Sequence, residues 1–253
     1  MTENEWHSDV PGADDFARQR DAWRAALGAD DALRHRAVEL QVAADRHAYT
    51  YTWEWLGVPI IRVPDDVVVL QELVWSLRPD RIVETGVARG GSLILNASLQ
   101  ALAGLTPRVL GIDILILEHT HRALADHPMA QGIELLESGS TDVESIKRTS
   151  EFLDGSDAAL LVLDSNHTHD HVLDELRQLA PLLPVGSYVV VADTLIEEFP
   201  EGHYVDRPWD RGNNPLTAVR AFLAENADFE LDTQWSRRAL MSEFRDGILR
   251  KAR

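Results

Sequence analysis

DRIVETGVARGGS, residues 80–92, is the stretch that decides the fold. A short apolar run ends in an acid, Glu84, and glycines follow at Gly86 and Gly90 before a helix-like run begins. This order predicts a strand, a tight glycine turn and the N-terminus of a helix. Because glycine has no Cβ and tolerates a positive φ angle, a ligand can approach the backbone of such a turn closely. In open α/β sheets that ligand lies outside the carboxyl end of the strand.

The spacing of the glycines favours one kind of ligand. GVARG is G-x-x-x-G, which differs from the dinucleotide motif G-x-G-x-x-G and from a P-loop, which ends in Gly-Lys-Ser/Thr. An acid two positions before the first glycine, in the pattern E-x-G-x-x-x-G, suits a ligand with a positive centre or a free amine, and S-adenosylmethionine has both. A second apolar run, RVLGID, ends in Asp113, where an acid can bind ribose hydroxyls. A plain strand-to-helix turn remains the alternative, but the two acids together favour an adenosine-type cofactor.

Composition excludes several classes of function. The 253 residues, 45% of them hydrophobic, suit one large globular domain. A net charge of -18 argues against nucleic acid or an anionic membrane surface as a partner, because both repel an acidic protein. The absence of cysteine excludes disulfides, a thiol nucleophile and cysteine metal sites. The N-terminus lacks a signal-peptide pattern, and no apolar run approaches the roughly 20 residues of a membrane span, so we expect a cytoplasmic protein.

The N-terminal region predicts a helical arm added to the main domain. Residues 1–13 have the composition of a mobile tail, and the helix-like stretch after them is broken near Asp30 or Asp31, either of which could cap a second helix. We place the arm at residues 1–47 and the main domain at residues 48–253. The arm is expected to cover the sheet or to pack on a second subunit, so a homo-oligomer is predicted.

A segment dense in aromatic residues follows the arm. In YTYTWEWLGVPII, residues 49–61, four aromatic side chains alternate and would share one face if the segment were extended. The segment could cover the core as a strand or lid. It could equally form an aromatic wall for a substrate or cofactor, since ligand pockets are rich in such side chains.

A second chemical centre follows two later strands. The continuous apolar run ALLVL is typical of a buried parallel strand and leads into Asp164, Asn166 and His167, while SYVVVAD ends in Asp193. The two aspartates are therefore expected at the carboxyl ends of neighbouring strands. They could bind a divalent cation through oxygen, as Mg²⁺ prefers, orient substrate hydroxyls, or cap helices. His167 is a candidate general base, because histidine side chains exchange protons near neutral pH.

A small-polar turn, SGSTD, follows another predicted strand. Ser140 or Thr141 could cap the next helix, or Ser140 could contact a cofactor, because this turn falls at the same sheet edge as Gly86. Further along, His169 and His171 are expected to be solvated.

The repeated order of strand, acid, turn and helix predicts an α/β fold with a mostly parallel sheet. Two final strand-like runs, FELDT and RALMSEF, predict an antiparallel hairpin at the sheet edge, as in small-molecule methyltransferases. The long loop that contains RPWDRGNNP is expected to be functional, since loops of this length in compact domains usually are. Pro215 is expected at the first turn of a helix.

Several long motifs in the same order resemble the cephalosporin hydroxylase family, which includes the rhamnosyl O-methyltransferases. They cover roughly residues 48–253 and read YTYTWEWLGVPIIRVPDDVVVLQELVWSLRPDRIVETGVARGGSLI, GID, ESGSTD, LDSNHTHDHVLDEL and RPWDRGNNPLTAV. The resemblance implies a Rossmann-like S-adenosylmethionine methyltransferase, often oligomeric, with a divalent metal in some members.

The resemblance also implies which residues contact the cofactor. Glu84, Gly86 and Gly90 would bind its methionine end, Asp113 would hold the ribose, and Ser140 would lie beside the adenine. Two further residues complete the expected set, one after the glycines and one under the sulfonium: Ser92 and Asp164.

One departure from the family pattern concerns the metal. Metal-using relatives carry acids where this chain has Asn166 and Ala192. An asparagine can still ligate Mg²⁺ through its carbonyl oxygen, so the candidate ligands are Asp164, Asn166 and Asp193, with Glu197 or Glu198 as possible helpers. The sequence shows no iron-binding facial triad, so hydroxylation has no visible chemistry here.

The sequence therefore predicts methyl transfer from S-adenosylmethionine to a hydroxyl of a small natural product, a sugar or a decorated secondary metabolite. His167 is the first candidate for the catalytic base and Asp193 the second. Two alternatives stay open: a nicotinamide-dependent oxidoreductase on the same layout, and a non-catalytic cofactor-binding partner of another enzyme.

Overall fold

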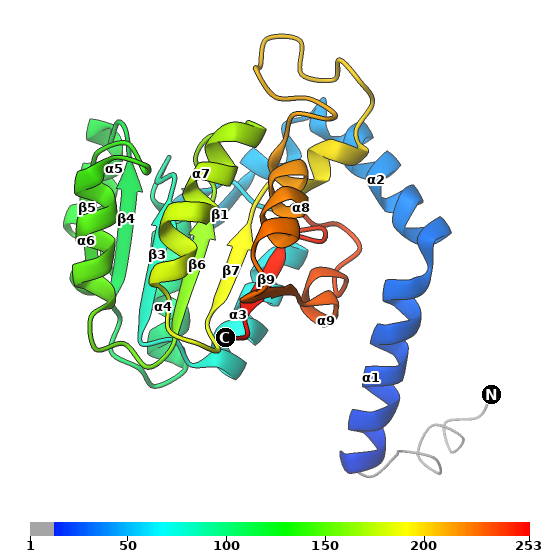
Figure 1. Ribbon diagram of the computed structural model, residues 1–253, viewed down its shortest axis with the longest axis horizontal. Helices are drawn as coiled ribbons and strands as arrows, with labels where there is room; N and C mark the ends of the chain where they lie inside the picture. Colours follow the sequence, from blue (N-terminus) through cyan, green and yellow to red (C-terminus); the bar gives the residue numbers. More distant parts are fainter. Residues whose placement is uncertain (1–12) are drawn as a thin grey trace.

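The computed structural model describes residues 13–253, and the predicted mobile tail therefore lies almost entirely outside the described residues. Its centre is a seven-stranded sheet in the order β5-β4-β3-β6-β7-β9-β8 (Figure 1). The parallel strands are β3 (Arg81–Thr85), β4 (Val109–Asp113), β5 (Ile133–Glu137), β6 (Ala159–Leu163) and β7 (Tyr188–Val191). The predicted α/β fold with a mostly parallel sheet is confirmed.

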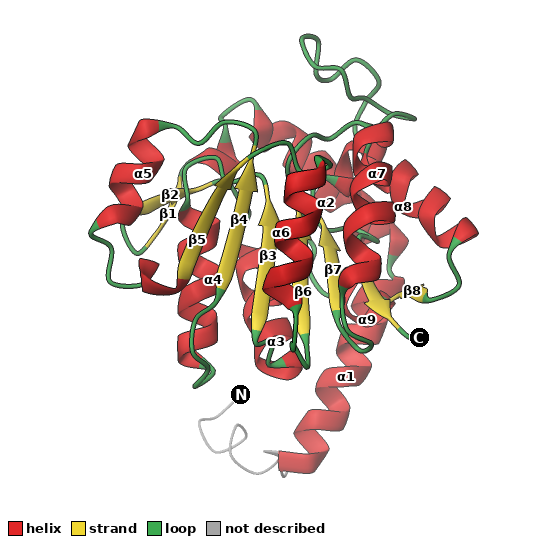
Figure 2. Cartoon of the chain, turned by 60° about the vertical axis from the view of Figure 1, so that its left-hand side comes forward, coloured by secondary structure: helices red, strands yellow, loops and turns green. Residues whose placement is uncertain are grey.

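Helices cover both faces of this sheet. Helices α3 and α4 lie on one face, and α6, α7 and α8 on the other (Figure 2). The helix bounds are α3 (Pro64–Leu77), α4 (Gly91–Leu102), α5 (Glu118–Ala125), α6 (Val143–Leu153), α7 (His169–Leu179), α8 (Pro215–Glu225) and the one-turn α9 (Thr233–Ser236). Short 3₁₀ segments are η2 (Tyr49–Tyr51), η3 (Ala130–Gly132), η4 (Ala180–Leu182) and η5 (Thr194–Glu198).

The core follows from the alternation of side chains along the central strands. Ile82 and Leu160 pack toward α3 and α4, whereas Val83 and Leu161 pack toward the opposite helices. All four are fully buried. Burying a side chain of this size contributes roughly 1.5–3 kcal/mol to the stability of the fold. Packing on both faces therefore fixes the sheet, and with it the loops at the carboxyl ends of its strands.

The carboxyl-terminal part of the sheet is antiparallel. The predicted strand FELDT is present as β8 (Phe229–Leu231), and it pairs with β9 (Ile248–Lys251), which also pairs with β7. The prediction of a strand at RALMSEF was wrong, because this segment is irregular. The Glu243 N–H donates to Asp66 at 2.7 Å and its carbonyl accepts from the Thr194 N–H at 3.1 Å. These backbone groups bind neighbouring loops and helices instead of a strand.

The N-terminal arm forms two helices, as predicted. Helix α1 (Ala13–Ala29) lies along the side of the molecule, and α2 (Asp31–Asp45) leads to the loop side of the sheet (Figure 1). The Asp30 carboxylate accepts a hydrogen bond from Leu33 N at 2.9 Å and caps α2, which confirms the predicted cap. No helix within residues 13–253 has the length and apolar character needed to cross a membrane.

The aromatic segment after the arm is not one extended strand. Tyr49–Tyr51 form a 3₁₀ turn, followed by the antiparallel hairpin β1 (Trp53–Trp55) and β2 (Val58–Ile60). Positive φ angles at Leu56 and Gly57 turn the chain between the two strands. The predicted common face therefore holds for the two tryptophans of β1 only.

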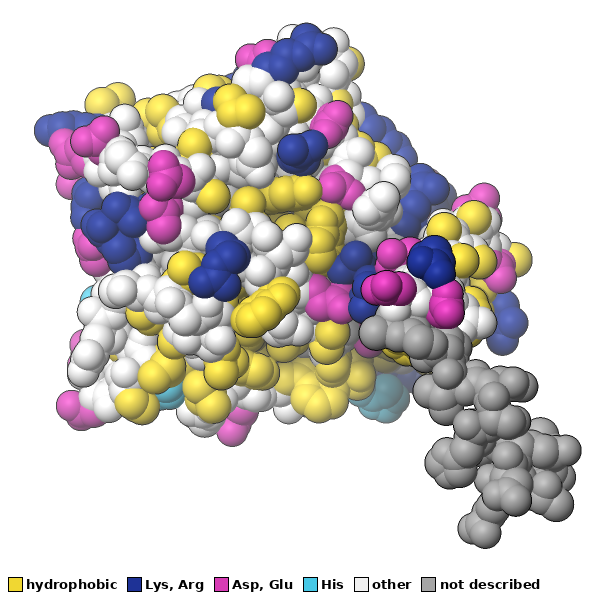
Figure 3. Space-filling model, turned by 90° about the horizontal axis from the view of Figure 1, so that it is seen from below, with side chains coloured by type: hydrophobic (Ala, Val, Ile, Leu, Met, Phe, Trp, Pro, Cys, Tyr) yellow, Lys and Arg dark blue, Asp and Glu magenta, His cyan; other side chains and the backbone are white. Residues whose placement is uncertain are grey.

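Apolar side chains are also exposed on the outer surface. Helices α3 and α4 expose Val68, Trp75 and Leu102. Seen from below, several apolar areas lie between groups of charged side chains (Figure 3). Such surface is compatible with a second subunit, and the oligomeric state stays a prediction.

Candidate active site

A cavity of about 650 Å³ lies at the carboxyl ends of β3, β4, β6 and β7. Its size is typical of sites for small molecules and cofactors. The glycine turn and Asp113 line one side, and residues from α2, η2 and the loop after β7 line another. The sheet therefore gathers the predicted site residues around one space.

The glycine turn has the predicted order of strand, turn and helix. Gly86 has φ +87° and Gly90 has φ +85°, and α4 begins directly afterwards. A Cβ placed on Gly86 would lie 2.0 Å from the Asp164 carbonyl oxygen, and one on Gly91 would lie 2.3 Å from that of Pro59. Glycine is required here both for backbone conformation and for close packing. The N-terminus of α4 is left facing the cavity.

Glu84 lies behind the cavity wall and does not line the cavity. Its side chain is fully buried, accepts a hydrogen bond from the Ser92 hydroxyl, and accepts another from Asn96 Nδ2 at 2.6 Å. Its hydrogen-bond partner Ser92 lines the cavity, and the direct contact of Glu84 with the cofactor stays a prediction. Burial raises the pKa of Glu84 to about 7.

The burial of Glu84 predicts a stability that depends on pH. Between the unfolded pKa near 4.5 and the folded pKa near 7, the folded chain holds a proton that the unfolded chain has lost. Stability therefore falls as pH rises through this window, by about 3 kcal/mol for this group. We expect Glu84→Gln to raise the free energy of unfolding by about this amount at pH 8 and to change it little near pH 4.

Urea unfolding at both pH values measures this effect. Asn96 Oδ1 has no partner among the described residues, so after rotation of its side chain it could accept the amide N–H that Glu84→Gln introduces. Glu201→Gln, at an exposed position, is the matched control and should show no such difference. An equal change in the free energy of unfolding of Glu84→Gln at both pH values would contradict the raised pKa of Glu84.

Asp113 holds the glycine turn from the side. Its Oδ2 accepts the N–H groups of Val87 and Ala88 at 2.8 and 3.3 Å, and its Oδ1 accepts that of Leu115 at 3.1 Å. Asp113 also lines the cavity, as does Ser140, which follows β5. The two residues thus lie on the predicted cofactor side.

The predicted capping of α6 by Ser140 or Thr141 was wrong. The helix begins after Asp142, whose carboxylate accepts the Gly139 N–H at 3.0 Å. The Ser140 hydroxyl instead lies 3.1 Å from His171 Nε2.

His171 was expected to be solvated, but it is half-buried and lines the cavity. Its Nε2 lies 3.1 Å from the Ser165 hydroxyl and 3.4 Å from Oε1 of the fully buried Glu175. Hydrogen bonding to Glu175 raises the pKa of His171. The serine and the glutamate contact the same ring nitrogen, whereas in a hydrolase triad the two partners of the histidine contact different nitrogens. The arrangement therefore cannot relay a proton as such a triad does.

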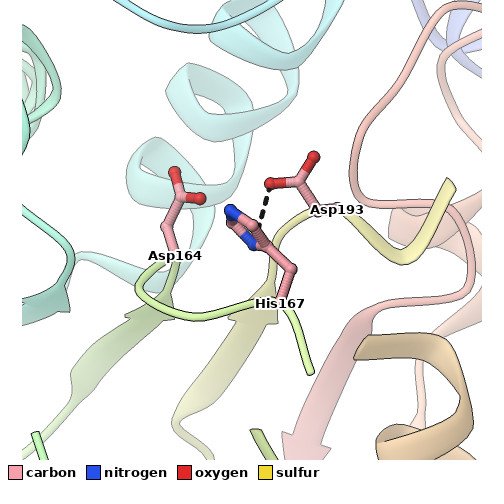
Figure 4. Close-up of side chains that lie close together, drawn as sticks. All are labelled: Asp164, His167 and Asp193. Atoms are coloured by element: carbon pink, nitrogen blue, oxygen red, sulfur yellow. Dashed lines mark ion pairs between the residues drawn. The ribbon is translucent and has the colours of Figure 1, made fainter. Parts of the chain in front are cut away.

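Asp164, His167 and Asp193 form the chemical centre of the cavity. They offer ligand atoms that all lie within 4.8 Å of one another. The imidazole lies between the two carboxylates, with Nδ1 3.2 Å from Asp193 Oδ2 (Figure 4). The ring packs edge-on against Trp209 at 4.7 Å between centroids. The predicted meeting of the two strand ends is confirmed by the pairing of β6 with β7.

Asn166, the third predicted metal ligand, lines the same cavity. Its side chain is exposed, and its Oδ1 accepts the Thr168 N–H at 3.0 Å. Glu197 binds Gly212 N and Asn214 Nδ2, and Glu198 pairs with Arg245. Asp164 and Asp193 have His167 as a neighbour, and the role of Asn166 as a metal ligand stays a prediction.

Arg62 is a site residue that sequence reasoning missed. Its Nη2 donates to Asp164 Oδ2 at 3.0 Å, and its guanidinium lies 4.8 Å from the centre of the Phe244 ring. The side chain is only 1% exposed. Burial raises the pKa of Asp164 to about 6, and the charge of Arg62 opposes this rise. A lone arginine inside the apolar run VPIIRVP is the signal that could have revealed it.

The arm and the loop after η5 close the far end of the cavity. Asp45 of α2 pairs with His203 Nε2 at 2.8 Å, and Val38 packs with Leu195 and Phe199. Tyr204, which packs edge-on against His203, lines the cavity. The predicted functional loop therefore contributes to the cavity wall.

The order of the strands and the cavity at their carboxyl ends define a Rossmann-like fold. Among solved structures, a CmcI structure with Mg and SAM has a TM-score of 0.57 at 21% identity and covers 80% of this chain and 78% of that one. A CmcI structure with SAH has a TM-score of 0.54 at 22% identity, covering 79% and 83%. At these identities the likeness concerns the fold.

Sequence comparison identifies the family. The model of the rhamnosyl O-methyltransferase/CmcI family matches residues 47–252. A rhamnosyl O-methyltransferase of Mycobacterium leprae is 30% identical over 76% of this chain and 82% of its own length. One from Mycobacterium tuberculosis is 31% identical over 73% and 74%. The chain belongs to this family, as the sequence motifs indicated, and is an S-adenosylmethionine-dependent O-methyltransferase.

Proposed function

We propose that this protein methylates a hydroxyl of a small natural product, and that the acceptor is a sugar or a metabolite that carries one. The observation that carries the proposal is a single cavity that joins the glycine turn to Asp164, His167 and Asp193. Relatives named rhamnosyl O-methyltransferase support a sugar hydroxyl as the acceptor.

The side of the cavity formed by the glycine turn fits S-adenosylmethionine. Gly86 and Gly90 leave the backbone open to its methionine end, and Ser92 lies behind them at the start of α4. Asp113 would hold the ribose, because each carboxylate oxygen can accept more than one hydrogen bond. Two residues complete the cofactor side, Ser140 beside the adenine and Asp164 near the sulfonium. When bound, the cofactor supplies an electrophilic methyl group.

His167 is the proposed base for the acceptor hydroxyl. Its Nδ1 contact with Asp193 orients the ring and leaves Nε2 free to take a proton. The acceptor oxygen forms its bond to the methyl carbon as the carbon–sulfur bond breaks, and the hydroxyl proton passes to His167. Trp209 and the walls of the cavity hold the two reactants in line, which lowers the entropic cost of the reaction.

A divalent cation is the alternative way to activate the hydroxyl. Asp164, His167 and Asp193 would hold it, since their ligand atoms converge. When bound, such an ion would make the acceptor hydroxyl easier to ionise. Mg²⁺ prefers oxygen ligands, whereas an imidazole suits transition metals better.

Calorimetry with S-adenosylhomocysteine and with NAD tests the cofactor, and mass spectrometry tests the reaction. We expect S-adenosylhomocysteine alone to bind, and we expect p-nitrophenyl α-L-rhamnopyranoside to gain one methyl group. Binding of NAD alone would favour the oxidoreductase alternative. Binding of S-adenosylhomocysteine without methylation of any sugar glycoside would favour a non-catalytic partner.

A further inference from the structure

Glu243 is a buried carboxylate on the cavity wall that the proposed reaction does not use. The residue is 8% exposed and lines the cavity. Its backbone is fixed through Asp66 and Thr194, yet no group within residues 13–253 donates a hydrogen bond to its carboxylate. Unlike the enclosed Oε2 of Glu175, its oxygens are not sealed in by protein, so they face the open space of the cavity.

The charges around Glu243 are unbalanced. Asp66, Asp164 and Asp193 all act on this carboxylate, and Arg62 is the cation that opposes them. Arg62 already donates to Asp164. Burial, and after it the charge of Asp193, raises the pKa of Glu243, because a buried carboxylate without a partner loses the water that would stabilise its charge. This corner of the cavity therefore favours a ligand group that carries positive charge.

Aromatic rings line the same end of the cavity. Tyr51 and Tyr204 line the cavity, as Glu243 does. Burial, and after it neighbouring carboxylates, raises the pKa of each phenol. Aromatic faces attract ammonium groups, and together with carboxylates they form a common setting for cationic ligands. The cofactor is expected on the opposite side of the cavity, beside the glycine turn.

A free metal ion accounts less well for this feature. Among the described residues, the group with converging ligand atoms consists of Asp164, His167 and Asp193, and Glu243 is not part of it. A neutral hydroxyl could hydrogen-bond to Glu243 but would not compensate the charge of its ionised form, whereas a cation would stabilise that form. A cation that belongs to the acceptor itself satisfies both the charge and the shape of this corner.

We propose that Glu243 binds a protonated amine of the acceptor, and that the preferred acceptor is an amino-bearing sugar or metabolite. This inference rests on the proposed methyltransferase function and names the chemistry of its acceptor. The carboxylate of Glu243 anchors the ammonium, while Tyr51 and Tyr204 provide the aromatic surface beside it. The acceptor is thereby held with a hydroxyl directed toward His167.

Calorimetry on the full-length protein saturated with S-adenosylhomocysteine tests the inference. The probes are D-glucosamine, N-acetyl-D-glucosamine and D-glucose, at about pH 6.5, where the amine is protonated, and in EDTA. We expect D-glucosamine to bind on the order of tenfold more tightly than either neutral sugar, as one charged hydrogen bond permits. Glu243→Gln should remove this preference. This variant keeps the side-chain size and the backbone contacts of residue 243. The comparison of the three sugars on the wild-type protein does not depend on the folding of any variant.

Asp206→Asn is the matched control, because it removes the same charge from an exposed residue outside the cavity and should keep the preference. Equal binding of the three sugars, or binding of none, would overturn the inference while leaving the methyltransferase proposal intact. A titration with Mg²⁺ forms a second arm, and a loss of Mg²⁺ binding in Glu243→Gln without any amine preference would also overturn it. Failure of S-adenosylhomocysteine to bind at the start would instead refute the proposed function.

Discussion

His167→Gln should lower kcat by about 10²–10⁴-fold while changing the affinity for S-adenosylhomocysteine little. The ring lies between Asp164 and Asp193, and its contact at Nδ1 leaves the other nitrogen free to accept the acceptor proton (Figure 4). Glutamine fills a similar volume but cannot take up a proton at neutral pH. The measurement is the rate of S-adenosylhomocysteine formation with p-nitrophenyl α-L-rhamnopyranoside, beside calorimetry of the cofactor product.

Two further variants make this result specific to the site. His121→Gln, at an exposed helix position outside the cavity, should leave kcat unchanged. Asp193→Asn should lower kcat as His167→Gln does, because the amide no longer stabilises a protonated imidazole. Asp193 has φ +55°, a conformation that asparagine adopts readily, so this variant is expected to fold.

The same assay separates a base from a metal ligand. If the wild type is inactive in EDTA and regains activity with a divalent cation, Asp164, His167 and Asp193 form a metal site. Wild-type turnover in both His167→Gln and Asp193→Asn would show that neither residue takes part in the reaction.

The elements of the sheet could be predicted because their signals are local. The run of five buried residues in β6 and the glycines after β3 are visible within a few positions of sequence. The convergence of the acids at the strand ends then follows from the rule that parallel strands present their carboxyl ends at one edge of the sheet. This reasoning places Asp113, Asp164 and Asp193 around one cavity without any knowledge of distances.

The site residues that the sequence did not reveal are brought to the cavity by contacts between distant segments of the chain. Arg62 and Asp164 are 102 residues apart in the sequence, and Glu243 reaches the cavity from an irregular segment whose sequence pattern predicts a strand. A pattern of period two cannot distinguish a strand from a loop whose backbone groups bind side chains such as Asp66. The exposure expected for His171 was wrong for the same reason, because its partner Ser140 is 31 residues away in the sequence.

Glu84 illustrates a different limit of prediction from sequence, which concerns the direction of a side chain. The sequence shows an acid before the glycine turn but does not show which side of the turn its side chain takes. Thr85, not Glu84, directly precedes Gly86, and alternation along β3 turns successive side chains to opposite faces. Glu84 therefore packs under α4 against Ser92 and Asn96.

Gly86→Ala should destabilise the fold by about 3–5 kcal/mol and weaken S-adenosylhomocysteine binding by at least about tenfold. The new Cβ would lie 2.0 Å from the Asp164 carbonyl oxygen and 2.5 Å from its carbonyl carbon. Both atoms belong to backbone, so relief requires the turn and the segment leading to His167 to move apart. Urea unfolding measures the stability loss, and calorimetry measures the loss of binding.

Gly186→Ala separates backbone strain from this collision. Gly186 has φ +92°, close to the +87° of Gly86, but a Cβ at this position would meet no other atom within 4 Å. Its substitution should therefore cost only about 1 kcal/mol, the usual penalty for a side chain in the left-handed region, with normal binding. Equal losses in the two variants would mean that conformation alone explains the glycine at position 86. A much larger loss in Gly86→Ala would tie the glycine turn to the strand end that carries Asp164, so that the proposed methyl donor site and the proposed base depend on one backbone contact.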